Sequence, residues 1–339
     1  MKRLVVLTAA AGLGLSGLSI VAPAASAQAK PHSQPIAWHD CSADLKAYAA
    51  NFPTLATATI QCATIKVPLD YKKPHGKKVP IALSRVKHTG SKSTFRGDLL
   101  VNPGGPGGTG TNFALRVAGQ SSPALAAAYD FVGFDPRGTG GSTPLSCDAN
   151  YFNPVRPDYV PHTRADVKFW LTKARNYAKA CGKKYGSFLK HLRTVDSVHD
   201  MNTIRYRLGQ KKLNYYGASY GTYLGGVYAT LFPRKVGRFV LDSSVAPSGV
   251  WYKANLEQDK AFDRNINIFF KWVAKNDATF KLGSYKAVKD LYYATYARLN
   301  KTPIKVALDP AKPTELTVVD GPAYNDYFLT SGYRASTAV

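Results

Sequence analysis

The fold is decided by the stretch Leu213-Asn-Tyr-Tyr-Gly-Ala-Ser-Tyr-Gly-Thr222. Its first part, Leu213 to Tyr216, is a short apolar segment that predicts a strand, and the spacing of apolar residues from Tyr220 to Phe232 predicts a helix. Between them, Gly217-Ala-Ser-Tyr-Gly221 fits the Gly-x-Ser-x-Gly pattern of a sharp turn that lifts a serine hydroxyl clear of the backbone. Because a strand precedes this pattern and a helix follows it, Ser219 is predicted to be a nucleophile.

The segments on either side of this turn predict alternating strands and helices. Two apolar segments, 63–69 and 79–86, flank a Lys-Lys-Pro-His-Gly sequence at 72–76 and are typical of a hairpin. Strands that alternate with helices after such a hairpin indicate an α/β fold, with a mostly parallel sheet and helices on both faces. The other expected elements are a short helix at 42–50, strands at 98–102, 129–135 and 236–241, and helices at 164–180 and 195–208.

A glycine-rich loop, Asn102-Pro-Gly-Gly-Pro-Gly-Gly108, follows the predicted strand 98–102. Because glycines have no side chains, backbone N–H groups of this loop can point toward a developing oxyanion and supply one hydrogen-bond donor. The N–H of Tyr220 would be the second donor. The alternative is that these glycines are needed only for a tight strand-to-helix turn and donate no hydrogen bond to an oxyanion. A phosphate-binding loop is not expected, because Gly108-Thr-Gly110 stands where that motif needs Gly-Lys-Ser or Gly-Lys-Thr.

Several motifs together resemble the secreted tripeptidyl aminopeptidase family of actinobacteria, which are α/β-hydrolases of the prolyl-aminopeptidase type. The resemblance covers roughly residues 36–300. The motifs are Pro103-Gly-Gly-Pro-Gly107, Asp135-Pro-Arg-Gly-Thr-Gly140, Asp200-Met201 to Arg205 with Leu208-Gly209, Tyr216-Gly-Ala-Ser-Tyr-Gly-Thr222, Phe232-Pro233 and Val240-Leu-Asp242.

This resemblance implies a serine exopeptidase that releases short peptides from free N-termini through an acyl-enzyme, without a cofactor. By the same resemblance Ser219 is the nucleophile, and Gly105 and Tyr220 are the oxyanion donors. The two aromatic-rich helices expected after Pro247, at 254–274 and 285–299, would begin a cap. Glu257 is a candidate for binding the α-amino group of the substrate, since cap acids do so in related aminopeptidases.

A histidine base and its orienting acid follow the serine along the chain in this fold. No histidine follows His199 in this sequence. His191 and His199 precede the serine turn, and we interpret them as surface residues. Asp242 ends the strand after the nucleophile helix, where some α/β-hydrolases hold the acid, but Ser243 and Ser244 suit a turn there equally well, and we prefer the structural interpretation. No triad acid or base is therefore identified in this chain.

The family resemblance places the acid and the histidine in a segment beyond the cap. We therefore interpret the chain as C-terminally truncated within the cap, with the last part of the core missing, and expect it to be inactive or incomplete. The expected organisation is a signal peptide at 1–27, the N-terminal portion of an α/β-hydrolase core at 28–250 and a partial helical cap at 251–339.

The N-terminus predicts export. Lys2 and Arg3 precede an apolar segment at 4–20, and Ala25-Ser-Ala27 offers a cleavage site. We therefore expect a secreted, extracellular protein, and association with the cell wall is an option that its basic charge leaves open. No later segment reaches about eighteen consecutive apolar residues, so no further membrane span is expected.

The four cysteines of this exported chain favour disulfides. Sequence proximity suggests Cys41 with Cys62 and Cys147 with Cys181, and the alternative is that one pair stays as buried thiols. The cysteines are far apart and no histidine pair has ligand spacing, so no metal site is expected.

The net charge of +24 comes from 45 lysines and arginines against 21 acidic residues. The basic residues are spread along the chain, whereas a nucleic-acid-binding protein concentrates them on one face, so no nucleic-acid partner is expected. The expected partners are a peptide with a free N-terminus and an anionic cell wall or membrane surface. The alternative is a solvated basic surface with no specific partner. The oligomeric state is not predicted.

Two competing functions remain open. The first is a non-catalytic wall-associated or peptide-binding remnant that kept half of the fold. The second is an esterase or lipase, because the same scaffold hosts many chemistries.

Overall fold

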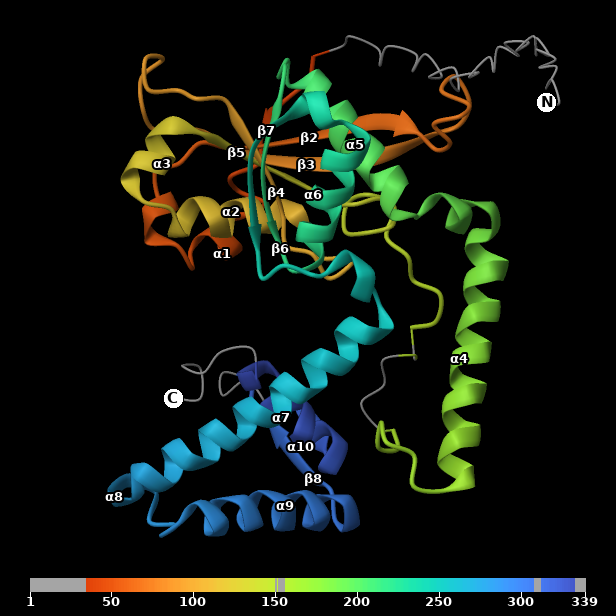
Figure 1. The fold of residues 1–339 in the computed structure, drawn as a ribbon, viewed down its shortest axis with the longest axis vertical. Helices are drawn as coiled ribbons and strands as arrows, with labels where there is room; N and C mark the ends of the chain where they lie inside the picture. Colours follow the sequence, from red (N-terminus) through yellow and green to blue (C-terminus); the bar gives the residue numbers. More distant parts are fainter. Residues whose placement is uncertain (1–34, 150, 152–155, 308–311, 333–339) are drawn as a thin grey trace, which may run out of the picture. The chain divides into compact units, whose positions relative to one another are not determined.

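The computed structural model describes residues 35–149, 151, 156–307 and 312–332 (Figure 1), so the expected signal peptide lies outside the described residues. The strands are β1 (His39–Asp40), β2 (Ile60–Pro68), β3 (Lys78–Val86), β4 (Asp98–Asn102), β5 (Asp130–Phe134), β6 (Leu213–Ala218), β7 (Val236–Asp242), β8 (Ile304–Ala307) and β9 (Leu316–Val319). The α-helices are α1 (Lys46–Ala49), α2 (Gly110–Gln120), α3 (Pro123–Ala128), α4 (Arg164–Tyr185), α5 (Thr194–Arg207), α6 (Tyr220–Leu231), α7 (Tyr252–Lys275), α8 (Asp277–Phe280), α9 (Tyr285–Lys301) and α10 (Gly321–Gly332).

Seven strands form one sheet in the order β1-β2-β3-β5-β4-β6-β7. β2 and β3 are an antiparallel hairpin, as the sequence predicts, and β3 also runs antiparallel to β5. From there on the neighbours β5, β4, β6 and β7 are all parallel. The expected α/β fold with a mostly parallel sheet is therefore confirmed. Parallel strands end at the same edge, which brings the loops after β4, β6 and β7 together.

Helices cover both faces of this sheet, with α2 on one face and α5 and α6 on the other (Figure 1). On the α5 and α6 side, Met201 and Leu224 belong to a core cluster that includes Tyr215 of the central strand β6. On the α2 side, Leu115 and Phe131 belong to a second cluster. A sheet buried on both faces explains why its central strands consist largely of apolar residues.

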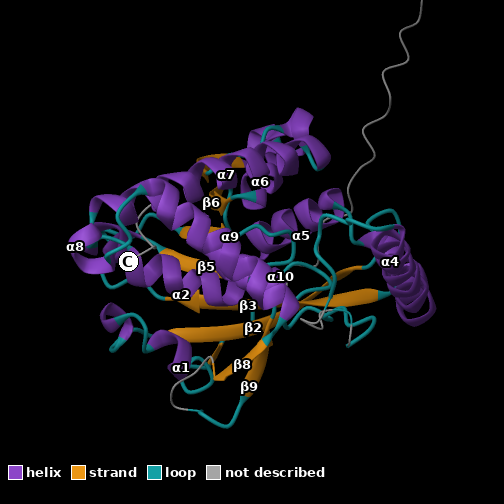
Figure 2. Ribbon diagram, turned by 90° about the horizontal axis from the view of Figure 1, so that it is seen from below, coloured by secondary structure: helices purple, strands orange, loops and turns teal. Residues whose placement is uncertain are grey.

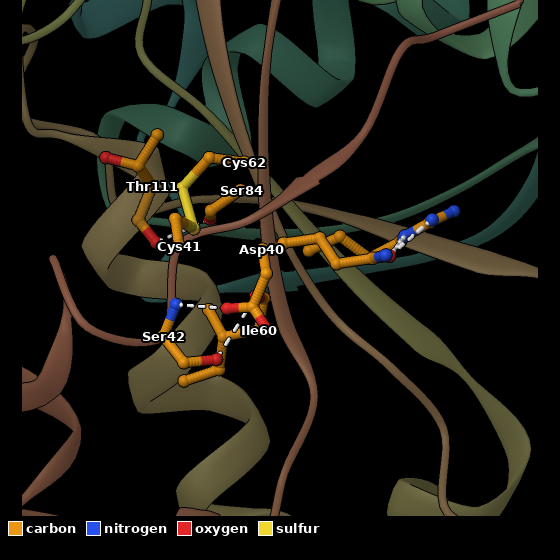
Figure 3. The surroundings of a disulfide bond; sticks show 9 residues. Asp40, Cys41, Ser42, Ile60, Cys62, Ser84 and Thr111 are labelled. Atoms are coloured by element: carbon orange, nitrogen blue, oxygen red, sulfur yellow. Dashed lines mark hydrogen bonds between the residues drawn. A yellow bond between two sulfur atoms is a disulfide. The ribbon is translucent and has the colours of Figure 1, made fainter.

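The structure contains both disulfides that the sequence suggests. Cys41 bonds to Cys62 with a Cα–Cα distance of 5.6 Å, and Cys147 bonds to Cys181 with 4.7 Å. Beside the first, Ser42 donates its backbone N–H to the Asp40 carboxylate at 2.8 Å (Figure 3). This disulfide ties the segment after β1 to β2.

Arg137 of the Asp135-to-Gly140 motif lies in a buried ion pair with Asp200 of α5, at 2.6 Å. Its guanidinium also donates to the backbone carbonyl oxygens of Pro68, Leu69 and His191. The hydrogen bonds satisfy both charges, which is the condition for burying such a pair. Arg137 thus joins the β2–β3 hairpin to α5, which is a structural role for this residue of the motif.

Asp98 begins β4 and is only 7% exposed. Burial raises the pKa of its carboxyl from the ordinary value of 3.8 to about 6, and the charge of Asp130 adds to the shift. Between these two pKa values the folded protein binds more protons than the unfolded chain. The contribution of Asp98 to the free energy of unfolding therefore falls as the pH rises from about 4 to about 6 and stays lower above that window.

We therefore expect Asp98→Asn, which imitates the neutral carboxyl, to raise the free energy of unfolding by about 1–3 kcal/mol at about pH 8 and to change it little at about pH 4. An asparagine oxygen can still accept the hydrogen bond that Gln210 Nε2 donates at 2.6 Å. Urea denaturation of both proteins at the two pH values measures the difference. A stability loss at about pH 8 would contradict this account of Asp98.

After β7 the chain turns to helices, and α7, α9 and α10 pack against one another (Figure 2). Phe270, Val273, Val288 and Tyr292 form their small core. Within the described ranges, no helix has the length and hydropathy that a membrane span requires.

Candidate active site

Ser219 lies in the turn between β6 and α6 with φ 54° and ψ −124°. This is a conformation that non-glycine residues rarely adopt, and such strain is retained where the surrounding structure holds it. Here the N–H and the Oγ1 of Thr222 donate to the Ser219 carbonyl oxygen at 2.9 and 2.6 Å. The Ser219 N–H donates to the backbone oxygen of Asp242 at 2.9 Å. The turn is fixed, and the serine is exposed at the carboxyl end of the parallel strands.

The glycines of this turn allow strand and helix to meet. A Cβ at Gly217 would lie 2.4 Å from the carbonyl oxygen of Gly221, and one at Gly221 would lie 2.6 Å from the backbone oxygen of Asn102. The Tyr215 hydroxyl donates to the same Gly221 oxygen at 2.7 Å. The Gly-x-Ser-x-Gly spacing therefore follows from backbone contacts on both sides of Ser219.

The glycine-rich loop after β4 lies against the serine turn. Gly104 has φ +89°, and a Cβ there would lie 2.5 Å from the Ala218 oxygen and 2.7 Å from the Tyr220 nitrogen. The side-chain oxygen of the fully buried Asn102 accepts a hydrogen bond from the Gly104 N–H at 2.9 Å. Gly105 follows with φ +112°. The structure thus places the loop that contains Gly105 against Ser219 and Tyr220, although the loop lies far from them in sequence.

Asp242 ends β7 beside this turn. The Tyr216 hydroxyl donates to its carboxylate at 2.9 Å, and the Ser243 hydroxyl donates at 3.2 Å. Burial, with the neighbouring Asp242 second, raises the pKa of Tyr216. Phe113 of α2 stacks on the Tyr216 ring with centroids 5.8 Å apart. The Asp242 carboxylate thus accepts hydrogen bonds from two hydroxyl groups, and its structural role stays a prediction.

His191 and His199 are half-buried, so describing them as surface residues is too simple. His199 stacks on Tyr71 at 4.8 Å and meets Phe232 edge-on at 5.4 Å. Burial lowers the pKa of His199, which favours a neutral ring. The carbonyl oxygen of His191 accepts a hydrogen bond from Arg137. Packing against Tyr71 and Phe232 thus accounts for the His199 ring, whereas the buried Nδ1 of His191 has no hydrogen-bond partner among the described residues.

Glu257 lies on α7 with its side chain 59% exposed, paired with Lys260 at 3.1 Å. A cavity of about 280 Å³ lies among α7, α9 and α10, and its carboxyl groups are those of Asp259 and Asp263. Glu257, Asp259 and Asp263 are all exposed, and Glu257 stays a prediction for binding the substrate amino group, with Asp259 and Asp263 at the cavity as further acids of the same helix. No signal in the sequence distinguishes the three acids before the helix face is known.

No group of three or more histidine, cysteine or acidic side chains within the described ranges is arranged to hold a metal ion. All four cysteines are used in disulfides.

Residues 99–335 match the family described as alpha/beta hydrolase fold. The chain belongs to this family, in agreement with its sheet and its serine turn. It is also 44% identical over 296 residues to the tripeptidyl aminopeptidase of Streptomyces lividans, a match that covers 85% of this chain and 53% of that protein. This similarity confirms the resemblance to the tripeptidyl aminopeptidase family of actinobacteria.

Two further relatives come from Mycobacterium tuberculosis strain H37Rv. Serine protease Hip1 is 34% identical over 273 residues, which cover 79% of this chain and 51% of that protein. Carboxylesterase B is 34% identical over 287 residues, with 79% and 53% covered. A solved proline iminopeptidase from Mycobacterium smegmatis is 16% identical, with a TM-score of 0.35 and coverage of 81% of this chain and 69% of that chain. The chain spans about half the length of the curated relatives it matches.

Proposed function

We propose that this chain carries the nucleophile portion of a secreted serine aminopeptidase that releases short peptides, such as tripeptides, from free N-termini. One observation carries the proposal: Ser219 is exposed in a strained turn, with a glycine-rich backbone loop packed beside the N–H of the next residue. Such a site combines a nucleophile with oxyanion donors. The tripeptidyl aminopeptidase relative supports a peptide substrate.

In the proposed reaction the Ser219 oxygen attacks the scissile carbonyl carbon, and its proton passes to a general base. The N–H groups of Tyr220 and Gly105 stabilise the negative oxygen of the tetrahedral intermediate. The C–N bond then breaks, the leaving amine takes the proton, and an ester to Ser219 remains. Water hydrolyses this ester and regenerates the serine. The general base is not identified among the residues of this chain.

The organisation of the chain is part of the proposal. Residues 1–27 direct export, 28–250 build the core that holds Ser219, and 251–339 form part of a helical cap. Removal of residues 1–27 takes away Lys2 and Arg3, and the remaining net charge of +22 (24 − 2 = 22) would attract the protein to anionic polymers outside the cell.

A second candidate is an esterase, and the identity to carboxylesterase B favours it. Ser219 and its oxyanion donors would serve an acyl ester equally well, since both reactions pass through an acyl-enzyme. The two candidates differ in the group that the substrate site recognises.

The experiment uses the chain extended at its C-terminus with the matching segment of a tripeptidyl aminopeptidase relative, because that segment would supply a base. We expect hydrolysis of a tripeptide anilide with a free N-terminus, at least about a hundredfold slower hydrolysis of the N-acetylated anilide, and loss of activity in Ser219→Ala. Equal rates on both anilides, or a preference for simple acyl esters, would support the esterase instead.

A further inference from the structure

An open basin lies at the edge of the sheet where β4, β6 and β7 begin. Its volume is about 660 Å³, and it is lined by Arg96, segment 209–212, Asn214 and segment 236–238. The three strands are parallel, and Ser219 follows the last residue of β6, so the basin and the serine lie at opposite edges. At about 3.3 Å per residue, β6 separates them by about 20 Å.

The basin is strongly cationic. Its rim carries the four exposed side chains of Arg96, Lys211, Lys212 and Arg238. Within the described part of the chain none of these four is ion-paired with a carboxylate. Arg96 donates to the backbone oxygen of Ser93 at 3.0 Å, and Arg238 donates to the Tyr129 hydroxyl at 3.5 Å. Their charges are therefore left for an external anion.

The loop 209–212, which carries Lys211 and Lys212, is fixed by hydrogen bonds from a buried arginine. Arg205 is only 6% exposed, and its guanidinium donates to the carbonyl oxygens of Gln210 and Lys211. These bonds fix the loop and add a further positive charge under it. The Asp98 carboxyl also lies beneath the loop, where it accepts from Gln210, and it offsets one positive charge. The four cations of the rim and Arg205 still outnumber this single carboxylate.

We propose that this basin, made of Arg96, Lys211, Lys212 and Arg238, binds a phosphate-bearing polymer. Arginine forks and lysine ammonium groups suit the oxygens of phosphodiesters. Each exposed charge pair contributes little by itself, so useful affinity requires several simultaneous contacts, which a repeating phosphodiester supplies. The inference rests on the anionic partner proposed above and gives that partner a site.

The position of the basin has a functional consequence. A polymer bound where the strands begin leaves the carboxyl edge, with Ser219 and its glycine loop, open to substrate. The protein can thus be retained on an anionic surface while its candidate active site faces away from it.

The test measures binding of the 339-residue chain to immobilised poly(glycerol phosphate) at about 0.1 M salt. The basin variant carries Arg96→Gln, Lys211→Gln, Lys212→Gln and Arg238→Gln. The matched control carries Arg175→Gln, Lys179→Gln, Lys183→Gln and Arg264→Gln, which are exposed helix positions. Both variants lower the net charge from +24 to +20 (24 − 4 = 20).

We expect the basin variant to bind at least about tenfold more weakly than the native chain and the control to lose less than about twofold. Equal losses in the two variants would overturn the basin and leave only attraction by total charge. Absence of binding by the native chain would contradict the anionic partner as well. Equally tight binding to polyglutamate would overturn the preference for phosphate.

Thermal unfolding by circular dichroism shows whether the basin variant is folded. If it is not, the double variant Lys211→Gln and Lys212→Gln gives the same test with two exposed residues. We expect it to lose about threefold in affinity for the polymer. Unchanged affinity would overturn the proposal.

Discussion

The 339-residue chain is expected to hydrolyse a tripeptide anilide no faster than its own Ser219→Ala variant. In the proposed site the fixed turn and the glycine loop position Ser219 as the nucleophile, but neither removes the serine proton at neutral pH. That step needs an imidazole within hydrogen-bond reach. No histidine follows Ser219 in this sequence. The His199 ring packs against Tyr71, and the His191 backbone oxygen is bound by Arg137.

Adding the C-terminal segment of a tripeptidyl aminopeptidase relative is expected to restore turnover, and Ser219→Ala in the extended chain should abolish it again. Loss of a catalytic triad costs on the order of a millionfold in turnover, so the contrast between the two chains should be unmistakable. The comparison requires four proteins, each chain with and without the serine. Rapid, Ser219-dependent turnover by the unextended chain would show that a base is already present, and His191 or His199 would then have to approach the serine.

The second large effect is expected at Gly104. A Cβ at this position would lie within 2.7 Å of the Ala218 oxygen and the Tyr220 nitrogen, both of them backbone atoms of the serine turn, and the φ of +89° is unfavourable for alanine. In Gly104→Ala the loop must move away from Tyr220. We therefore expect kcat of the extended chain to fall by about a hundredfold to a thousandfold, the size of effect seen when an oxyanion donor is displaced.

Gly226→Ala is the matched control for this variant. Gly226 lies in α6, a short distance after the serine turn, and its Cβ would meet nothing within 4 Å. We expect this control to keep its kcat and to gain about 0.5–1 kcal/mol in stability, because alanine is the better helix former. A Gly104→Ala protein that keeps full kcat would exclude a role for the loop in catalysis.

The sheet and the serine turn could be predicted because their signals are local. The apolar segment 213–216 and the glycines around Ser219 favour a strand followed by a sharp turn. In the structure this strand, β6, is two residues longer than predicted and ends at Ala218. The helix expected at 42–50 is shorter, at Lys46–Ala49. Asp40, Cys41 and Ser42 before it are engaged in side-chain bonds and a disulfide that interrupt regular helix.

What could not be predicted depends on long-range packing. Helix α2 begins at Gly110 inside a glycine-rich segment, and the contacts that stabilise it come from β3 and β5. The half-burial of His199 results from contacts with Tyr71 and Phe232, which are distant in sequence. The cationic basin likewise combines three separate segments. The residue pattern of one segment does not show which distant segments it will contact in the folded protein.

The most direct test of the central claim is to identify the residue that a mechanism-based reagent modifies. The extended chain would be treated with an alkyl fluorophosphonate, digested and analysed by mass spectrometry. We predict one phosphonylated residue, Ser219, no adduct in the Ser219→Ala variant, and greatly slowed labelling in the unextended chain. Labelling that persists in Ser219→Ala, or an adduct on Ser243 or Ser244 in place of Ser219, would contradict the assignment of Ser219 as the nucleophile.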